Sequence, residues 1–252
     1  MRILSIGNSF SQDAHAYLHD AARSLGVELE CRNLYIGGCS LERHARNLAS
    51  GEAAYTLQIN GRAEEKPVSL GETLRDGRYD VVTLQQSSPL SGFPETFHPY
   101  IDALYAAVRE SQPEARVYLH ETWAYEADST HPAFAQYGSS QTRMAGQVRE
   151  AYARVAAELG LPRIPVGRVV RYFRESVPGY AVAQGGRRLT RDGYHLSIPM
   201  GRLLAALVWI EALTGRDVSG IGFVPSKASE EDACCVPEMA EAVHRYMAQS
   251  RR

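Results

Sequence analysis

The chain has 252 residues, of which 44% are hydrophobic types and 22% are charged. This is enough apolar material for one globular domain with a substantial core, so we expect a single domain over residues 1–252. A formal net charge of −2 produces no long-range field that would attract nucleic acid or an anionic membrane surface. The composition therefore favours a small neutral or mildly polar ligand and argues against a nucleic-acid or membrane partner.

The sequence predicts neither a targeting segment nor a membrane span. Met1 and Arg2 lead into an apolar run too short for a secretory signal, and no small-residue cleavage site follows it. No segment approaches the roughly 20 apolar residues that a membrane-spanning helix needs. The 4 cysteines lack C-x-x-C spacing and the density of a disulfide framework, which favours reduced thiols in a cytoplasmic protein.

Strands and helices alternate along the first part of the chain. In order, the patterns predict a strand at 2–6, a helix at 14–25, a strand at 27–35 and a helix at 40–48. Residues 55–70 then form two extended runs around Asn60 and Gly61, two residues that tolerate positive φ. We expect a hairpin there, as an excursion from the main sheet.

The alternation continues in the second part of the chain. The expected elements are a continuous apolar strand at 80–84, a helix at 99–110, a strand at 116–120, a helix at 141–159, a strand at 163–166 and helices at 198–213 and 237–249, with a loop at 215–232. About five strands separated by helices predict a three-layer α/β/α, flavodoxin-like sandwich with a doubly wound parallel sheet. Two irregular stretches, 87–98 and 123–140, follow strand ends and are expected to form walls of a cleft.

A serine stands at the end of the first strand, in the run G-N-S-F-S over residues 7–11. Ser9 is thereby placed at a helix start, where free backbone N–H groups and the helix dipole favour developing negative charge. Such a position suits a nucleophile. Taken alone, however, Ser9 or Ser11 in this turn is more often a simple helix cap.

A carboxylate and an imidazole stand three positions apart late in the chain, just before an expected helix. In a turn, Asp192 can accept a hydrogen bond from one ring nitrogen of His195, leaving the other nitrogen to take the proton of a serine hydroxyl. Judged without Ser9, a helix cap and an exposed histidine explain the pair equally well. Together with Ser9 they favour a catalytic triad, in a chain that lacks the G-x-S-x-G elbow of α/β-hydrolases.

These motifs resemble those of the SGNH (GDSL-type) hydrolase superfamily, and in particular a bacterial branch whose first block reads G-N-S-F. The resemblance covers most of the chain, and it implies that Ser9 is the nucleophile, with Asn8 where the commoner form has Asp. It also implies that Gly38, in the run I-G-G-C-S over residues 36–40, offers its N–H to the oxyanion beside the N–H of Ser9. For Gly37 a plain tight turn remains an alternative.

The third block of the superfamily, G-x-N-D, is replaced here by L-Q-Q-S-S over residues 84–88. A glutamine amide presents the same N–H donor as asparagine on a longer stem, so Gln85 is expected to complete the oxyanion hole. We prefer Gln85 because it directly follows the strand, although a register slip of one residue would exchange it with Gln86. Either residue is equally well explained as a loop cap or a solvent-facing side chain.

Two aromatic residues, Trp123 and Tyr125, follow the expected strand at 116–120. They are expected beside the site as a substrate-binding wall, stacking on a sugar ring or lining an acyl pocket. Aromatic residues at a strand end are more often fillers of the core or of an interface.

Metal sites are the first rival. His15 and His19 have a spacing that can chelate a metal, with Asp13 nearby, but no third ligand is evident. His120 and Glu121, joined with the D-x-x-H motif, would suit a metal-dependent phosphoesterase. Adjacent residues of a strand face opposite sides, which makes joint ligation awkward and ranks the metal hypothesis below the serine one.

Other rivals are a thiol nucleophile and a protein without catalysis. Cys39 lies at a helix start with His44 near it, although a buried apolar role is the commoner one for such a cysteine, as it is for Cys234 and Cys235. A flavodoxin-like binding module would use the first turn to cradle a phosphate, but it has no need of the D-x-x-H motif.

We therefore expect a serine esterase that needs no cofactor or metal and forms an acyl-enzyme on Ser9. By resemblance, its substrate is a short-chain carboxylic ester, in the first place an acetyl ester of a carbohydrate. The sequence leaves the ester itself and the oligomeric state open.

Overall fold

The computed structural model describes residues 1–182 and 185–250. Its strands form one sheet in the order β4-β3-β2-β1-β5-β6-β7. They are β1 (Arg2–Gly7), β2 (Glu30–Tyr35), β3 (Tyr55–Ile59), β4 (Arg62–Val68), β5 (Val81–Leu84), β6 (Arg116–His120) and β7 (Arg163–Ile164). The five strands from β2 to β7 in this order run parallel, which confirms the doubly wound α/β/α fold expected from the sequence.

The hairpin around Asn60 and Gly61 is present, and both residues have positive φ, of 50° and 78°. The expectation that it leaves the main sheet is wrong, because β3 pairs antiparallel with β2 and β4 pairs with β3. Without β3, the edge of β2 would expose unpaired backbone N–H and C=O groups. The new edge, β4, is protected by exposed charged residues and by Pro67, which cannot donate to a further strand.

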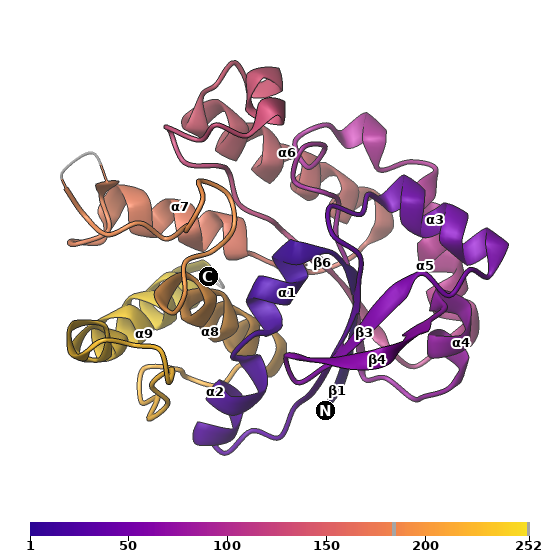
Figure 1. Ribbon diagram of the computed structural model, residues 1–252, viewed down its shortest axis with the longest axis horizontal. Coiled ribbons are helices and arrows are strands. Elements are labelled where there is room, and N and C mark those ends of the chain that lie inside the picture. Colours follow the sequence, from indigo (N-terminus) through magenta and orange to yellow (C-terminus); the bar gives the residue numbers. More distant parts are fainter. Residues whose placement is uncertain (183–184, 251–252) are drawn as a thin grey trace.

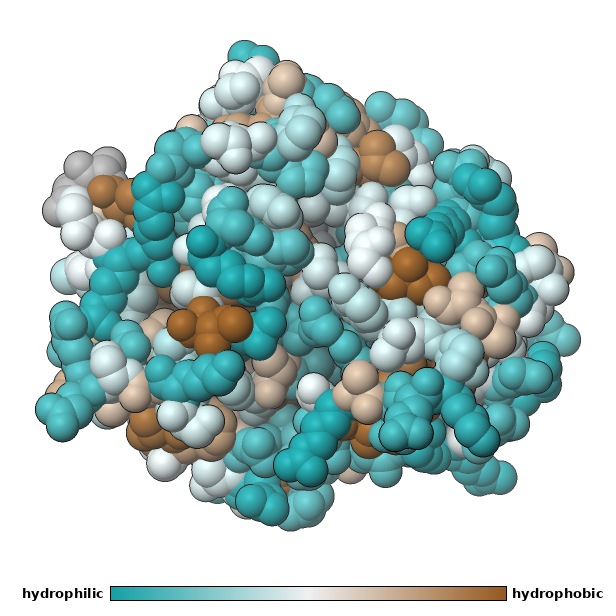
Figure 2. All heavy atoms as spheres, viewed as in Figure 1, coloured by the Kyte–Doolittle hydropathy of each residue, from teal (hydrophilic) through white to brown (hydrophobic). Residues whose placement is uncertain are grey.

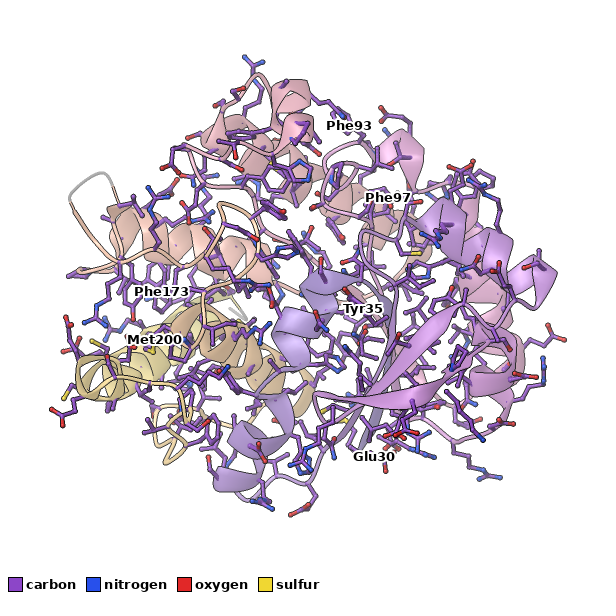
Figure 3. All side chains as sticks on the ribbon, viewed as in Figure 1. Glu30, Tyr35, Phe93, Phe97, Phe173 and Met200 are labelled. Carbon is purple, nitrogen blue, oxygen red and sulfur yellow. The ribbon has the colours of Figure 1, made fainter. Side chains whose placement is uncertain are left out.

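Helices cover both faces of the sheet. Their bounds are α1 (Ser9–His15), α2 (Leu18–Ser24), α3 (Leu41–Ser50), α4 (Leu70–Arg75), α5 (Tyr100–Ser111), α6 (Gln141–Leu159), α7 (Val166–Ser176), α8 (Met200–Thr214) and α9 (Glu230–Ser250). In Figure 1, α1, α2, α8 and α9 pack on one side of the sheet, and α3, α4 and α5 on the other. Among the side chains labelled in Figure 3, Phe173 of α7 and Met200 of α8 lie on the first side and Phe97 on the second; all three are buried.

Two helices begin earlier than their sequence patterns predict. The helix expected at 14–25 is two helices in the structure: α1 begins at Ser9, where Asn8 caps it, and α2 starts only at Leu18. The last begins at Glu230, so Pro237 lies inside it and not in its first turn. Ser229 and Asp232 exchange backbone and side-chain hydrogen bonds of 3.1 and 3.2 Å, and this capping box starts the helix two turns before the proline.

The molecular surface is polar over most of the face in Figure 2, with apolar residues in separate patches. In the part of the chain that the structure describes, Ile198 and Val224 are the exposed large hydrophobic residues. Within residues 1–182 and 185–250, no helix combines the length and the apolar composition that a membrane span requires.

Candidate active site

Ser9 is the first residue of α1 and directly follows the turn at Asn8 that joins β1 to this helix, at the carboxyl edge of the parallel sheet. Asn8 is extended and accepts a hydrogen bond of 3.0 Å from the Phe10 N–H, which opens the helix. A Cβ at Gly7 would lie 2.2 Å from Ser11 Oγ, so only glycine leaves room for this turn. The side chain of Ser11 is buried and bonded to the backbone, whereas Ser9 is partly exposed. Of the two serines, Ser9 is therefore the one that a ligand can reach.

The Asp192–His195 turn brings its imidazole to Ser9. His195 Nε2 lies 2.9 Å from Ser9 Oγ, and His195 Nδ1 lies 2.7 Å from Asp192 Oδ2. The other carboxylate oxygen accepts the backbone N–H groups of Tyr194 and His195, at 3.1 and 2.7 Å. The structure thus links the three side chains that the sequence singles out by consecutive hydrogen bonds, although Ser9 and His195 stand 186 positions apart in the sequence.

The hydrogen bonds among Asp192, His195 and Ser9 determine which nitrogen of His195 carries the ring proton. Partial burial opposes ionisation of Asp192, but the bonds from the ring and backbone of His195 and from the Tyr194 N–H lower the pKa of the carboxyl below its usual value. An ionised carboxylate only accepts hydrogen bonds, so the ring proton of neutral His195 is on Nδ1. His195 Nε2 is then free to accept the hydroxyl proton of Ser9.

Asp13, one turn after Ser9 on α1, links the Asp192–His195 turn (below, the histidine turn) to this helix. Its carboxylate is fully buried and accepts the Leu196 N–H at 2.8 Å, Arg191 at 3.1 Å and Arg202 at 2.8 Å. From the sequence, Asp13 is a candidate only for a metal ligand. The available signal was an acidic residue on the buried face of a helix, four positions after the nucleophile candidate.

Trp123 and Tyr125 do not face a substrate, which corrects the expectation for both. Trp123 is fully buried, stacks on Phe10 with ring centroids 4.1 Å apart, and donates its Nε1–H to the Tyr194 carbonyl at 2.7 Å. Tyr125 is also fully buried, with its hydroxyl 2.9 Å from Ser88 Oγ. Both rings fill the core next to the site, and the hydrogen bond from Trp123 to the Tyr194 carbonyl holds the histidine turn against this core.

The partly exposed rings at the site are those of Tyr194 and His131, two residues that no motif of the sequence specifies. The ring centroid of Tyr194 lies 4.4 Å from that of His195, and the ring of His131 lies 4.8 Å from that of Tyr194. His131 Nδ1 accepts the Ala133 N–H, so its neutral ring carries the proton on Nε2. Burial, and then the nearby His195, lower the pKa of His131, which favours this neutral form.

Asn8 connects the turn of Ser9 to the two other strand ends of the predicted oxyanion hole. Its Nδ2 donates to the Cys39 carbonyl at 3.0 Å, next to Gly38, and its Oδ1 accepts from Gln85 Nε2 at 2.7 Å. Gly38 has a φ of 63°, and a Cβ there would meet no atom within 4 Å, so the backbone conformation is what requires glycine. An aspartate at position 8, the commoner residue of the superfamily, could not donate to the Cys39 carbonyl.

The two glutamines at the end of β5 have different partners. Gln85 lies against Asn8, whereas the Gln86 amide oxygen accepts the Leu41 N–H at 3.0 Å and its nitrogen donates to the Thr96 carbonyl at 2.9 Å. Of the two, Gln85 is therefore the residue whose side chain adjoins the turn of Ser9.

In each of the two residue pairs considered as metal ligands, the side chains have different partners and do not meet. His15 Nε2 lies 2.8 Å from Ser5 Oγ inside the core, whereas His19 Nδ1 lies 2.6 Å from the Leu29 carbonyl. His120 ends β6 and Glu121 follows it, and their side chains have separate partners, as predicted: Glu121 pairs with Arg163 at 3.0 Å, whereas His120 contacts Gln85. The described residues contain no group of three or more His, Cys, Asp or Glu side chains arranged to hold a metal ion.

The surroundings of Cys39 disfavour the ionised thiolate that a thiol nucleophile would need. Cys39 is buried, and burial raises the pKa of its thiol to about 12. His44, whose Nδ1 lies 3.5 Å from the sulfur, is buried as well, and burial lowers its pKa to about 3. A thiolate is therefore disfavoured at this position.

Three buried histidines lead us to expect a fold that loses stability in acid. Burial lowers the pKa of His15, His44 and His120 to about 3, while unfolding returns each to an ordinary value near 6.5. Between these pH values the unfolded chain binds more protons, so stability present at pH 7 is lost as the pH falls below about 6.5. For three protons, we expect the free energy of unfolding to fall by about 4 kcal/mol per pH unit near pH 5.

Urea unfolding at pH 7, 6 and 5 measures this slope, and equal free energies of unfolding at pH 5 and 7 would contradict it. His98 serves as the control because it lies on the surface, where its hydrogen bond with Asp102 raises its pKa. Its contribution has the opposite sign, so a His98→Gln variant is expected to be at least as sensitive to acid as the wild type.

Comparison with known proteins places this chain in a family. The model of the domain of unknown function DUF4886 matches residues 2–242. A DUF4886 family protein from Bacteroides uniformis is 31% identical and superposes with a TM-score of 0.89, over 100% of this chain and 96% of that one. Curated protein sequences give no match.

More distant structures share the fold. A protein from Slackia heliotrinireducens, described as a candidate SGNH hydrolase, is 26% identical with a TM-score of 0.56, over 84% of this chain and 98% of that one. A variant of an acetyl-xylooligosaccharide esterase from Geobacillus is 14% identical with a TM-score of 0.51, over 90% of this chain and 97% of that one. The chain thus belongs to the DUF4886 family, and its fold is that of SGNH hydrolase structures.

Proposed function

We propose that this protein is a serine esterase that hydrolyses a short-chain carboxylic ester through an acyl-enzyme on Ser9. The observation that carries the proposal is the chain of hydrogen bonds from Asp192 through His195 to Ser9, with distances of 2.7 and 2.9 Å. Nucleophilic acyl transfer needs three groups: a reachable hydroxyl, a ring nitrogen free to accept its proton, and an ionised carboxylate bonded to the other ring nitrogen.

In the proposed reaction, Ser9 Oγ attacks the ester carbonyl carbon while its proton passes to His195 Nε2. Asp192 stabilises the imidazolium that forms, and the imidazolium returns the proton to the leaving alcohol as the ester bond breaks. Water then attacks the acyl-enzyme and loses a proton to His195. The imidazolium returns this proton to Ser9 Oγ as the bond between Ser9 and the acyl group breaks, which releases the carboxylic acid and regenerates the free enzyme.

The negative charge on the carbonyl oxygen needs hydrogen-bond donors. We assign this role to the backbone N–H groups of Ser9 and Gly38 and to Gln85 Nε2. The Ser9 N–H lies at the start of α1 and the Gly38 loop is bonded to Asn8, which supports placing both beside the nucleophile. The Gln85 amide nitrogen carries two hydrogens, of which the bond to Asn8 uses one. Loss of one such donor costs roughly 3 kcal/mol in the activation barrier.

For the substrate, we propose an acetyl ester of a carbohydrate. The partly exposed rings of Tyr194 and His131 beside His195 provide an aromatic face on which a sugar can pack, and His131 offers an Nε2–H donor. The similarity in fold to an acetyl-xylooligosaccharide esterase is consistent with this class.

The test compares wild type and Ser9→Ala in turnover of 4-nitrophenyl acetate and in labelling by a fluorophosphonate probe. We expect Ser9→Ala to lose labelling and to lower kcat at least about 10⁴-fold, because the nucleophile is absent. Ser24→Ala is the matched control: this serine is exposed on α2 and bonds only within its own helix, so labelling and turnover should persist.

Other outcomes distinguish the rival functions. Labelling that persists undiminished in Ser9→Ala removes the serine mechanism. Turnover that a chelator abolishes favours a metal-dependent phosphoesterase, and a folded wild type inert to every ester favours a binding module. Acetate release from acetylated xylo-oligosaccharides, compared with hydrolysis of 4-nitrophenyl butyrate, tests the carbohydrate assignment.

A further inference from the structure

His120, the last residue of β6, is a fully buried imidazole that the proposed mechanism does not use. Its Nδ1 lies 2.6 Å from Gln85 Oε1. The ring packs between two tryptophans, with centroids 5.0 Å from Trp209 and 6.2 Å from Trp123. It is therefore held in place by packing and bonded to the side chain proposed as an oxyanion donor.

The hydrogen bonds around Gln85 have only one consistent direction. The Phe10 N–H can only donate, so the Asn8 atom that it contacts is the oxygen Oδ1. The Gln85 atom 2.7 Å from this oxygen must then be the nitrogen, and the atom facing His120 must be the oxygen Oε1. His120 Nδ1 therefore carries the proton and donates it to Gln85.

The charge state of His120 agrees with this direction. Burial lowers its pKa to about 3, so at neutral pH the ring has one N–H. His120 Nε2 is buried without a hydrogen-bond partner among the described residues, and as a bare nitrogen it has no hydrogen to donate. The single proton on Nδ1 is thus used for Gln85.

We infer that His120 is a positioning residue of the proposed oxyanion hole, acting through Gln85. This inference rests on the proposed function of Ser9. Without the Nδ1–H, Gln85 Oε1 would be a buried acceptor with no donor, which is unfavourable, and the amide would gain the freedom to turn over. A turned amide would set its oxygen against Asn8 Oδ1 and remove the N–H from the oxyanion.

Two substitutions separate positioning from packing. His120→Leu keeps a side chain of similar bulk but has no donor, and we expect it to lower kcat for 4-nitrophenyl acetate about 10²-fold with little change in KM. His120→Asn sets an amide nitrogen close to the place of Nδ1 and should restore most of kcat. His98→Asn, on the surface, is the matched control and should match wild type.

A double-mutant cycle tests the route through Gln85. In a Gln85→Ala background, His120→Leu should cause no further loss of kcat, because the donor that it positions is already absent. Full additivity of the two losses would overturn the inference, as would equal impairment in His120→Asn and His120→Leu. Retention of wild-type kcat by folded His120→Leu would do so too.

A measurement on the wild type keeps the inference open to refutation if the leucine variant does not fold. The ¹⁵N spectrum of labelled histidines, assigned with His120→Asn, should show His120 neutral at pH 7 with its proton on Nδ1. A proton on Nε2 would overturn the inference. Failure of the proposed function gives a different result, since wild type would then neither turn over esters nor react with fluorophosphonate.

Discussion

Replacing Asp192 with asparagine is expected to lower kcat about 10⁴-fold without unfolding the protein. The asparagine oxygen can still accept the Tyr194 and His195 N–H groups that Asp192 Oδ1 accepts now, so the turn keeps its local structure. The amide nitrogen, however, would face His195 Nδ1, and two donors cannot share a hydrogen bond. The ring would move its proton to Nε2 and could no longer take the proton of Ser9.

Steady-state kinetics with 4-nitrophenyl acetate measure this loss, and far-UV circular dichroism checks the fold. Asp128→Asn is the matched control, because Asp128 is a surface carboxylate whose hydrogen bond with Arg188 lowers its pKa. It should retain the kcat of wild type. If Asp192→Asn keeps kcat within about tenfold of wild type, Asp192 does not determine the tautomer of His195.

Replacing Asp13 with asparagine is expected to lower the free energy of unfolding by about 3–5 kcal/mol. Asp13 Oδ1 accepts from Arg202 and Arg191, and Oδ2 accepts from Leu196 and Arg191. An amide nitrogen in either position would therefore face a donor. Two arginines would also lose their buried counter-ion, which is what makes breaking such a pair costly.

Urea titration followed by tryptophan fluorescence measures this change. Asp20→Asn, an exposed position on α2, is the control and should change the free energy of unfolding by no more than about 0.5 kcal/mol. Because Asp13 links the histidine turn to α1, kcat should fall together with stability. A loss of stability below about 1 kcal/mol would show that the contacts of Asp13 are not a main link between the two elements.

Local patterns were sufficient to predict most of the fold. The continuous apolar run at 80–84 and the strand expected at 116–120 correspond to β5 and β6, and the Asn60-Gly61 pair does form a hairpin turn. These signals are local because they depend on side-chain period and on backbone conformations that few residues tolerate. The place of the hairpin was not predictable in this way, since it depends on which strand of the sheet has an open edge.

The residues of the site likewise fall into those that the sequence reveals and those that only the structure reveals. Ser9 and the D-x-x-H motif could be singled out because a serine at a strand-to-helix turn and an acid three residues before a histidine are visible in the sequence. The roles of Asp13 and His120 are not visible in the sequence, since their partners lie far away in the chain. Trp123 was misplaced because an aromatic residue at a strand end has the same sequence pattern whether it is buried or exposed.

By itself, the sequence determined the layered α/β architecture, the candidate nucleophile and the candidate acid–base pair, because periodicity and short motifs specify local structure. Only the tertiary structure decided that Ser9 and His195 share a hydrogen bond, that Gln85 and not Gln86 adjoins the turn of Ser9, and that Tyr194 and His131 are the partly exposed rings of the site. These facts depend on contacts between segments far apart in the chain, and the packing of the core is what brings such segments together.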